Sequence, residues 1–153
     1  MRSTTRRAAA GALVAGAAAG AAAGQGTGSS QNPAKQVHYH PGKKPEGIPL
    51  YSTALTLGNL VFISGTGVSE PSDVGGQTDR VLKSIEERLI LVGSSMEKCV
   101  KCNVYLQDLS DYDEMNRAFR GRFGPEPPVR TTVAVSGIPL KGCKVEIEVI
   151  AYR

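Results

Sequence analysis

The sequence predicts one α+β domain with the element order β-β-α-β-α-β-β. Five short segments are apolar or alternate between apolar and polar residues, as half-buried strands do. Two longer segments repeat apolar residues at intervals of three and four, which is typical of amphipathic helices. Because two such helices can cover only one face of one sheet, we expect a single sheet with both helices on the same face.

A β-hairpin is predicted around Gly58-Asn59. Apolar segments stand on both sides of this dipeptide, 55–57 before it and 60–63 after it. Two such segments joined by Gly-Asn are typical of a tight hairpin turn. We expect the second strand to end within 64–67 and a loop to follow over 68–76.

Two helices follow from the spacing of apolar residues. The first is predicted over 77–92, with Gly93 as a natural stop. The second begins at Ser110, where a capping hydroxyl and nearby acids favour a helix start, and it ends at Gly124-Pro125. Its apolar stripe is expected to face the core and consists of Tyr112, Met115, Phe119 and Phe123.

Alternation predicts the remaining strands over 99–106, 130–137 and 143–152. In the first of them, the residues expected to share one face are Val100, Cys102, Val104 and Leu106. In the last, one face is expected to carry Val145, Ile147, Val149 and Ala151, and the opposite face Glu146, Glu148, Ile150 and Tyr152. A mixed face of that kind suits subunit contact and a polar cavity, or else a solvated sheet surface.

The domain is predicted to span 48–153, behind two N-terminal segments. Residues 1–24 combine Arg6-Arg7 with an uncharged Ala/Gly run and a small-residue cleavage site, which indicates a cleavable targeting segment. It is too short to span a bilayer, so no membrane contact is expected after processing. The arginine pair resembles a twin-arginine export signal and favours a periplasmic or secreted protein. An organellar transit peptide is the alternative. Residues 25–47, rich in Gly, Ser and Pro, are predicted to be a flexible linker.

The charge distribution argues against a nucleic-acid-binding domain. Of 18 basic and 14 acidic residues, the first 45 positions hold six basic ones and no acid, so the rest of the chain has a net charge of −2. Nucleic-acid-binding proteins usually carry a basic face on the folded domain. We therefore expect no nucleic-acid partner.

Arg130 is the first candidate for binding chemistry. The prolines at 125, 127 and 128 force an extended chain that leads into Arg130, where a strand is predicted to begin. A guanidinium held there can grip a carboxylate through two parallel hydrogen bonds. A surface arginine at a strand end is the alternative, since charged residues are mostly exposed.

Glu146 is the second candidate, because it stands in the middle of an otherwise apolar strand. A carboxylate at this place can orient or activate a water molecule. Glu148 projects from the same face, roughly 7 Å away. Two glutamates on a solvated face are the plainer interpretation of this pair.

No metal or cofactor site is predicted. A zinc site needs four ligands, and Cys99-x-x-Cys102 with Cys143 offers no second cysteine pair. We expect Cys102 to be a small core residue. His38 and His40 fall in the predicted linker and are expected to be solvated. The sequence contains no phosphate-binding or dinucleotide fingerprint.

The run from Pro49 to Arg153 resembles the Rid/YjgF family of reactive intermediate deaminases. Four stretches carry the resemblance, in order and spacing, and they are 51–65, 77–95, 104–116 and 130–133 with 145–151. The resemblance implies a chorismate-mutase-like fold with a single mixed sheet and a homotrimer with cavities between its subunits. It also implies hydrolysis of reactive enamines and imines, such as 2-aminoacrylate or 2-imino acids, to 2-keto acids and ammonia without a cofactor.

The same resemblance assigns roles by position. Arg130 would bind the carboxylate of the imino or enamino acid, and Glu146 would position the attacking water. The remaining substrate-binding positions would be Tyr51, Ser64, Gly65, Asn116 and Thr132, the last of which is a cysteine in many members. Three departures are Thr53, Thr66 in place of a glutamine, and a shortened loop over 68–76. They leave open a non-enzymatic trimer that binds small carboxylates or acts like a chaperone.

Overall fold

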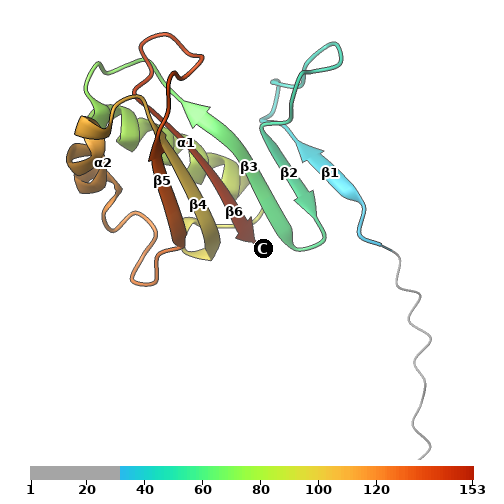
Figure 1. The fold of residues 1–153 in the computed structure, drawn as a ribbon. Helices are drawn as coiled ribbons and strands as arrows, with labels where there is room; N and C mark the ends of the chain where they lie inside the picture. Colours follow the sequence, from blue (N-terminus) through green and yellow to red (C-terminus); the bar gives the residue numbers. More distant parts are fainter. Residues whose placement is uncertain (1–31) are drawn as a thin grey trace, which may run out of the picture. The chain divides into compact units, whose positions relative to one another are not determined.

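Residues 32–153 are the part of the chain that this computed structural model describes, and they form one mixed sheet with both helices on the same face (Figure 1). The predicted α+β class, single sheet and two helices are confirmed. The strands are β1 (Lys35–His38), β2 (Ala54–Leu57), β3 (Leu60–Gly67), β4 (Cys99–Leu106), β5 (Val129–Ala134) and β6 (Val145–Tyr152). The helices are α1 (Val74–Leu91) and α2 (Tyr112–Phe119), with short 3-10 turns at Met96–Lys98 and Leu109–Asp111.

The strand order is β1-β2-β3-β6-β4-β5, which places the C-terminal strand in the interior of the sheet. Neighbouring strands are antiparallel except β4 and β5, which run parallel because the segment with α2 returns the chain to the same end of the sheet. The alternation predicted for the last strand is confirmed, since Val145, Ile147, Val149 and Ala151 are all buried. These side chains form the centre of the core beneath the helices.

The opposite face of the sheet is not covered by a helix within residues 32–153 (Figure 1). Its side chains are partly exposed and include Leu55, Phe62 and Ile150 together with Glu146 and Glu148. Phe62 and Ile150 are direct partners across β3 and β6.

The sheet begins earlier than predicted. β1 lies inside 25–47, the segment expected to be a flexible linker, and pairs in antiparallel fashion with β2. His38, expected to be solvated, is partly buried and shares a 2.9 Å hydrogen bond with Thr56 Oγ1. Main-chain pairing to an existing strand orders this segment, and local composition does not reveal such pairing. The predicted targeting segment 1–24 and the linker up to residue 31 lie outside the described residues.

The helix α1 starts three residues before the predicted start, inside the segment expected to be a loop. Asp73 caps it, because its Oδ1 accepts a 2.6 Å hydrogen bond from the Gly76 backbone N–H. The face of α1 that packs on the sheet carries Val81, Ile85 and Leu89, all fully buried, as their spacing predicted. Neither helix in residues 32–153 has the length and hydropathy needed to cross a membrane.

The helix α2 ends at Phe119, earlier than predicted, because Gly121 turns the chain with a φ of 77°. Phe123 therefore lies beyond the helix, yet it is still buried and its ring stacks 4.9 Å from that of Phe119. Tyr112, expected in the apolar stripe, is 39% exposed. The stripe prediction is correct for Met115 and the two phenylalanines and wrong for the tyrosine.

The strand β4 has a bulge that changes which side chains are buried. The register with β6 shifts between Cys99 and Lys101. Cys99 therefore occupies the inward position that alternation assigned to Val100, which is 45% exposed. Cys102 is fully buried and is confirmed as a core residue. A bulge inserts one extra residue into a strand, and the local sequence does not show where this bulge occurs.

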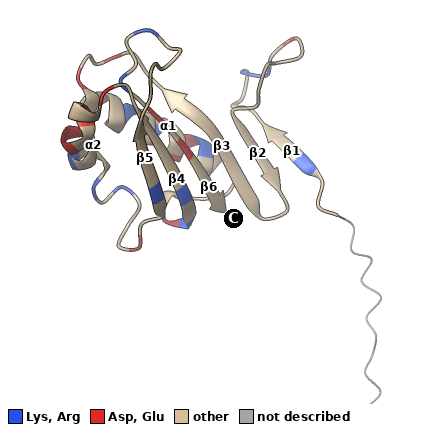
Figure 2. Ribbon diagram, in the orientation of Figure 1, with Lys and Arg blue, Asp and Glu red and all other residues tan. Residues whose placement is uncertain are grey.

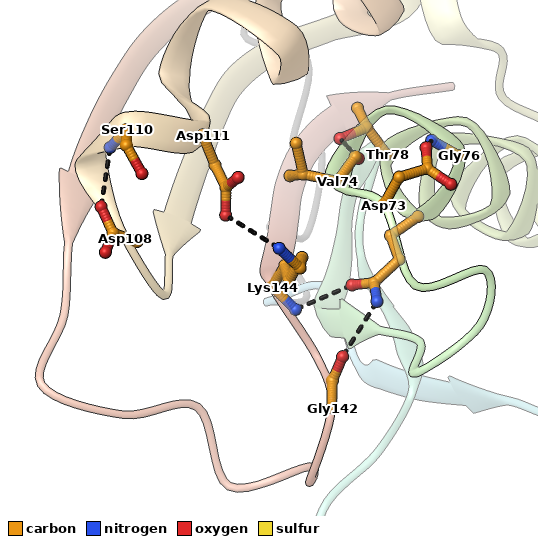
Figure 3. Close-up of polar contacts among 10 residues, drawn as sticks. Asp73, Val74, Gly76, Thr78, Asp108, Ser110, Asp111, Gly142 and Lys144 are labelled. Atoms are coloured by element: carbon orange, nitrogen blue, oxygen red, sulfur yellow. Dashed lines mark hydrogen bonds and ion pairs between the residues drawn. The ribbon is translucent and has the colours of Figure 1, made fainter.

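Gln77 joins α1 to the chain segment that leads into β6. Its side-chain amide donates a 2.9 Å hydrogen bond to the Gly142 carbonyl and accepts one of 2.7 Å from the Lys144 N–H. Figure 3 shows these contacts beside the pair formed by Lys144 Nζ and Asp111 Oδ2, 3.8 Å apart. The fully buried Gln77 thereby fixes the loop between β5 and β6, which contributes to the site described below.

Candidate functional site

Arg130 lies in a surface pocket between α2 and the edge strand β5. The Arg130 pocket has a volume of about 440 Å³ and is lined by Asp113, Asn116, Arg117, Phe119, Arg120 and Arg130. Arg130 Nη2 donates a 2.8 Å hydrogen bond to Asn116 Oδ1. The guanidinium carbon lies 4.6 Å from the centroid of the Phe119 ring, within cation–π range. Two contacts from one helix therefore hold the guanidinium in a defined orientation.

The strand pairing determines the face on which Arg130 projects. Arg130 is the register partner of Cys102 on β4, and Cys102 is in turn the partner of the buried Val149 on β6. Register partners share a face of the sheet. Arg130 therefore projects on the helix-covered side, at the edge where α2 leaves space for a ligand.

Glu146 lines a second pocket at the open edge of β3. The Glu146 pocket has a volume of about 570 Å³, and its lining includes Tyr51, Thr53, Ser64, Gly65, Thr66, Gly67, Arg88, Pro139, Leu140 and Glu146. The strand β2 pairs with β3 only as far as Ile63. Beyond that point the edge of β3 has no strand beside it among the described residues, and the pocket forms there.

The absence of a side chain at Gly65 leaves space for the Glu146 carboxylate. A Cβ atom at position 65 would collide with Glu146 Oε1 and would lie 3.0 Å from Glu146 Cδ. The backbone of Gly65 is not in the left-handed region, so a side chain is excluded here by space and not by conformation. The Glu146 carboxylate thus lies directly against the main chain of β3, in space that a side chain at position 65 would occupy.

Ser64 and Tyr51 complete this wall of the pocket. The Ser64 backbone N–H donates a 3.1 Å hydrogen bond to the Thr53 carbonyl, and its hydroxyl lies 3.4 Å from the same oxygen. Tyr51 is 67% exposed, and it faces the pocket from the segment before β2. A serine hydroxyl, a phenol and a carboxylate are therefore available to one small polar ligand.

The two pockets lie on opposite faces of the same sheet. Glu146 alternates with the buried Val145 and Ile147, so it projects on the side without helices. Tyr105 on β4 is the register partner of Glu146 on β6 and of Val133 on β5. Because Arg130 lies three residues before Val133, it is two strands and three residues away from Glu146. From strand spacing and rise the two Cα atoms are roughly 14 Å apart. One small ligand cannot contact both side chains within a single copy of the chain.

Comparison with known proteins identifies the family of this chain. The family model described as Endoribonuclease L-PSP matches residues 42–153. A RutC family protein from Pyrococcus abyssi is 38% identical over 118 residues, which cover 72% of this chain and 92% of that protein. The chain belongs to the Rid/YjgF family.

Other Rid/YjgF relatives have informative names or solved structures. Reactive Intermediate Deaminase A, chloroplastic, from Arabidopsis thaliana is 36% identical over 116 residues, which cover 71% of this chain and 62% of that protein. The crystal structure of the Rid family protein YyfA from Yersinia pestis has 33% identity and a TM-score of 0.69, and the match covers 78% of this chain and 100% of that one. The resemblance inferred from the sequence is confirmed by these matches.

The residues singled out by the Rid/YjgF resemblance fall into two groups. Arg130 and Asn116 meet in one pocket, and Tyr51, Ser64, Gly65 and Glu146 meet in the other. Thr132 lines neither pocket: it follows Arg130 on the same face, beside Val104, and its Oγ1 is buried without a hydrogen-bond partner in residues 32–153. The structure thus places these residues in two separate pockets and gives Thr132 no polar contact within residues 32–153.

Glu148 is held by protein side chains on the open face of the sheet. Its Oε1 accepts hydrogen bonds of 2.8 Å from Asn103 Nδ2 and of 3.0 Å from the Tyr105 hydroxyl. Partial desolvation and the hydrogen bond to Glu148 raise the pKa of Tyr105. Glu148 is therefore engaged by protein side chains two residues along β6 from Glu146.

The cysteines have no place in either pocket. All three are buried and free, and burial raises the pKa of Cys99 and of Cys102 to about 12. Their thiols are consequently neutral and poorly nucleophilic near neutral pH. Within residues 32–153, no three His, Cys, Asp or Glu side chains converge in a way that could hold a metal ion.

Arg88 is a pocket residue that the sequence analysis did not single out. It lies on α1 next to the buried stripe, and its Nη1 donates a hydrogen bond to Thr66 Oγ1. The signal was present, because Arg88 follows Ile85 and precedes Leu89, at the margin of a face that is otherwise apolar. The sequence does not show that the edge of β3 is open beside this part of α1.

Proposed function

We propose that this protein hydrolyses reactive enamines and imines, such as 2-aminoacrylate and 2-imino acids, to 2-keto acids and ammonia. The observation that carries the proposal is the pair of half-sites: a guanidinium oriented by Asn116 and Phe119, and a carboxylate held over Gly65. The name of the Arabidopsis relative, a reactive intermediate deaminase, supports the same activity.

Arg130 would bind the carboxylate of the imino acid. Its orientation is set before a ligand arrives, because one nitrogen is engaged by Asn116 and the planar group lies against Phe119. A planar guanidinium can donate two parallel hydrogen bonds to a carboxylate, which fixes direction as well as position. The C=N carbon next to that carboxylate is then held at a constant distance from position 130.

Glu146 would orient the attacking water and accept its proton. Water adds to the C=N carbon, and an enamine reaches the same imine by tautomerisation. The proton taken up by the carboxylate then passes to the nitrogen, which gives a carbinolamine with a hydroxyl and an amino group on the same carbon. The carboxylate next carries the hydroxyl proton to the amino nitrogen, the C–N bond breaks as the C=O bond forms, and a 2-keto acid and ammonia remain. An imine carbon is already electrophilic, so holding substrate and water together supplies much of the rate gain.

A homotrimer would bring the half-sites together. Arg130 and Glu146 project from opposite faces of one sheet, so a shared ligand requires Arg130 from one copy and Glu146 from another. The uncovered sheet face, with Leu55, Phe62 and Ile150, offers apolar surface for such an assembly. Cyclic symmetry then repeats the composite site at each subunit boundary.

Charge favours a small carboxylate over RNA as the substrate. Positions 46–153 have a net charge of −2, and positive and negative side chains are interspersed over the described elements (Figure 2). Phosphate contacts by basic residues dominate nucleic-acid affinity. This balance supports a small-molecule deaminase more than the ribonuclease named in the description of the family model.

The first experiment measures turnover of a 2-imino acid that an amino-acid oxidase generates in the assay. We expect kcat/KM to fall at least about 100-fold in Arg130→Ala, with Arg130→Lys between this variant and the wild type. Arg80→Gln, an exposed arginine on α1, is the matched control and should match the wild type. Equal rates for wild type and Arg130→Ala would refute the assignment, and ligand binding without turnover would favour a non-enzymatic carboxylate-binding trimer.

A second experiment tests whether the site is shared. Copies with Arg130→Ala are mixed under refolding with copies carrying Glu146→Gln, each inactive alone. If each site combines Arg130 of one copy with Glu146 of another, random assembly restores about a quarter of the wild-type activity. If both residues acted within one copy, no mixed assembly would contain a complete site, and activity would stay absent.

A further inference from the structure

Arg88 brings a second guanidinium to the Glu146 pocket. It extends from the helix side of the sheet towards the open edge of β3, where Thr66 accepts its hydrogen bond. Thr66 is itself buried and donates a 3.0 Å hydrogen bond to the Ser64 carbonyl. The contact therefore anchors Arg88 at the wall that also carries Ser64 and Gly65.

The charge of Arg88 has no carboxylate partner in residues 32–153. Two ion pairs are formed by side chains there, Arg122–Asp79 and Lys144–Asp111, and neither includes Arg88. Burial lowers the pKa of Arg88, while the nearby Tyr51 and Glu87 raise it. A partly desolvated guanidinium with a hydroxyl as its protein partner is stabilised by an anion that enters the pocket.

We propose that Arg88 binds a second acidic group of the substrate, so that the site prefers 2-imino acids with a carboxylate in the side chain. This inference rests on the proposed function, because it assigns the substrate class of the same site. Arg130 of a neighbouring copy holds the carboxylate next to the C=N carbon, and Glu146 holds the water. Arg88 then binds the distal carboxylate, as in a four- or five-carbon imino dicarboxylate.

The size and chemistry of the Glu146 pocket fit such a substrate. Its volume of about 570 Å³ accommodates a five-carbon chain together with a water molecule. Arg88 lines this pocket together with Glu146 and Tyr51. A 2-imino acid with a neutral side chain of the same length leaves the Arg88 guanidinium without a charged partner. The pocket therefore binds this neutral substrate more weakly than the acidic substrate.

The experiment compares two imino acids of equal length, made in the assay from glutamate and from norvaline by amino-acid oxidases. We expect the wild type to prefer the acidic one. In Arg88→Gln, kcat/KM for the acidic substrate should fall about 10- to 100-fold, mainly through KM, with less than about a threefold change for the neutral one. Arg88→Lys should recover part of the preference, and Arg80→Gln should leave both rates unchanged. An equal loss on both substrates, or no preference in the wild type, would overturn the inference.

A binding measurement separates this inference from the proposed function. If the wild type turns over no imino acid, the deaminase proposal fails, but 2-oxoglutarate and 2-oxopentanoate still probe the pocket by calorimetry. We expect the wild type to bind 2-oxoglutarate about 10- to 100-fold more tightly, and Arg88→Gln to bind both alike. Equal affinities in the wild type would overturn the role of Arg88 whatever the activity.

Discussion

The close approach of Gly65 to Glu146 allows the position of the carboxylate to be tested without removing it. In Gly65→Ala the new Cβ atom would collide with Glu146 Oε1 and lie 3.0 Å from Cδ, where ordinary contact begins at 3.4 Å. The carboxylate must therefore move, by a distance on the order of 1 Å, to restore contact distances. A displacement of this size at a reacting centre costs about 100-fold in rate.

The stability of Gly65→Ala is expected to change little. The colliding atoms belong to the far end of a flexible side chain, and the backbone at position 65 has no positive φ that a side chain would strain. Replacing glycine also lowers the entropy of the unfolded chain, which contributes about 0.4–1 kcal/mol in the opposite direction to the clash. We expect the free energy of unfolding to stay within about 1 kcal/mol of the wild type.

The assay is steady-state hydrolysis of a 2-imino acid, measured together with urea unfolding. Gly137→Ala is the matched control, because a Cβ atom there meets nothing within 4 Å. We expect kcat about 100-fold lower in Gly65→Ala and unchanged in Gly137→Ala, with both variants folded. Full activity of Gly65→Ala beside an inactive Glu146→Gln would refute the reasoning, because the carboxylate would then act independently of its position.

Three further predictions concern buried side chains. Gln77→Ala removes a fully buried side chain together with its hydrogen bonds to the Gly142 carbonyl and from the Lys144 N–H, so the free energy of unfolding should fall by about 2–4 kcal/mol. The exposed Gln107→Ala should cost less than about 1 kcal/mol, and equal urea midpoints for the two variants would contradict this. The thiols of Cys99 and Cys102, with pKa raised from 9.0 to about 12 by burial, should resist alkylation at pH 8 until the protein unfolds. Since the folded state retains these protons, stability should also decline as the pH rises from about 9 to 12, and a constant stability over that range would show that the thiols are accessible.

The sequence by itself determined the elements and the chemistry of the candidate side chains. Periodicity depends on which residues face the core, so the two helices and the buried side of β6 followed from spacing alone. Arg130 was identifiable because an extended, proline-rich segment leads into it. Glu146 was identifiable because it is a charged residue inside an otherwise apolar strand. The same reasoning failed where one residue of register decides burial, as at Val100, and where pairing to a distant strand orders a polar segment, as in β1.

The tertiary structure alone decided which of these side chains meet. Faces are assigned within one strand by alternation, but the relation between strands depends on pairing, and the chain order does not show that β6 lies between β3 and β4. That order separates Arg130 from Glu146 and sets them on opposite faces. The edge of β3 beside α1 is open because β2 pairs with β3 only as far as Ile63, and Arg88, at the margin of a helix face, therefore lines the pocket. Contacts between residues far apart in the chain depend on the whole packing arrangement, and short-range patterns carry no record of it.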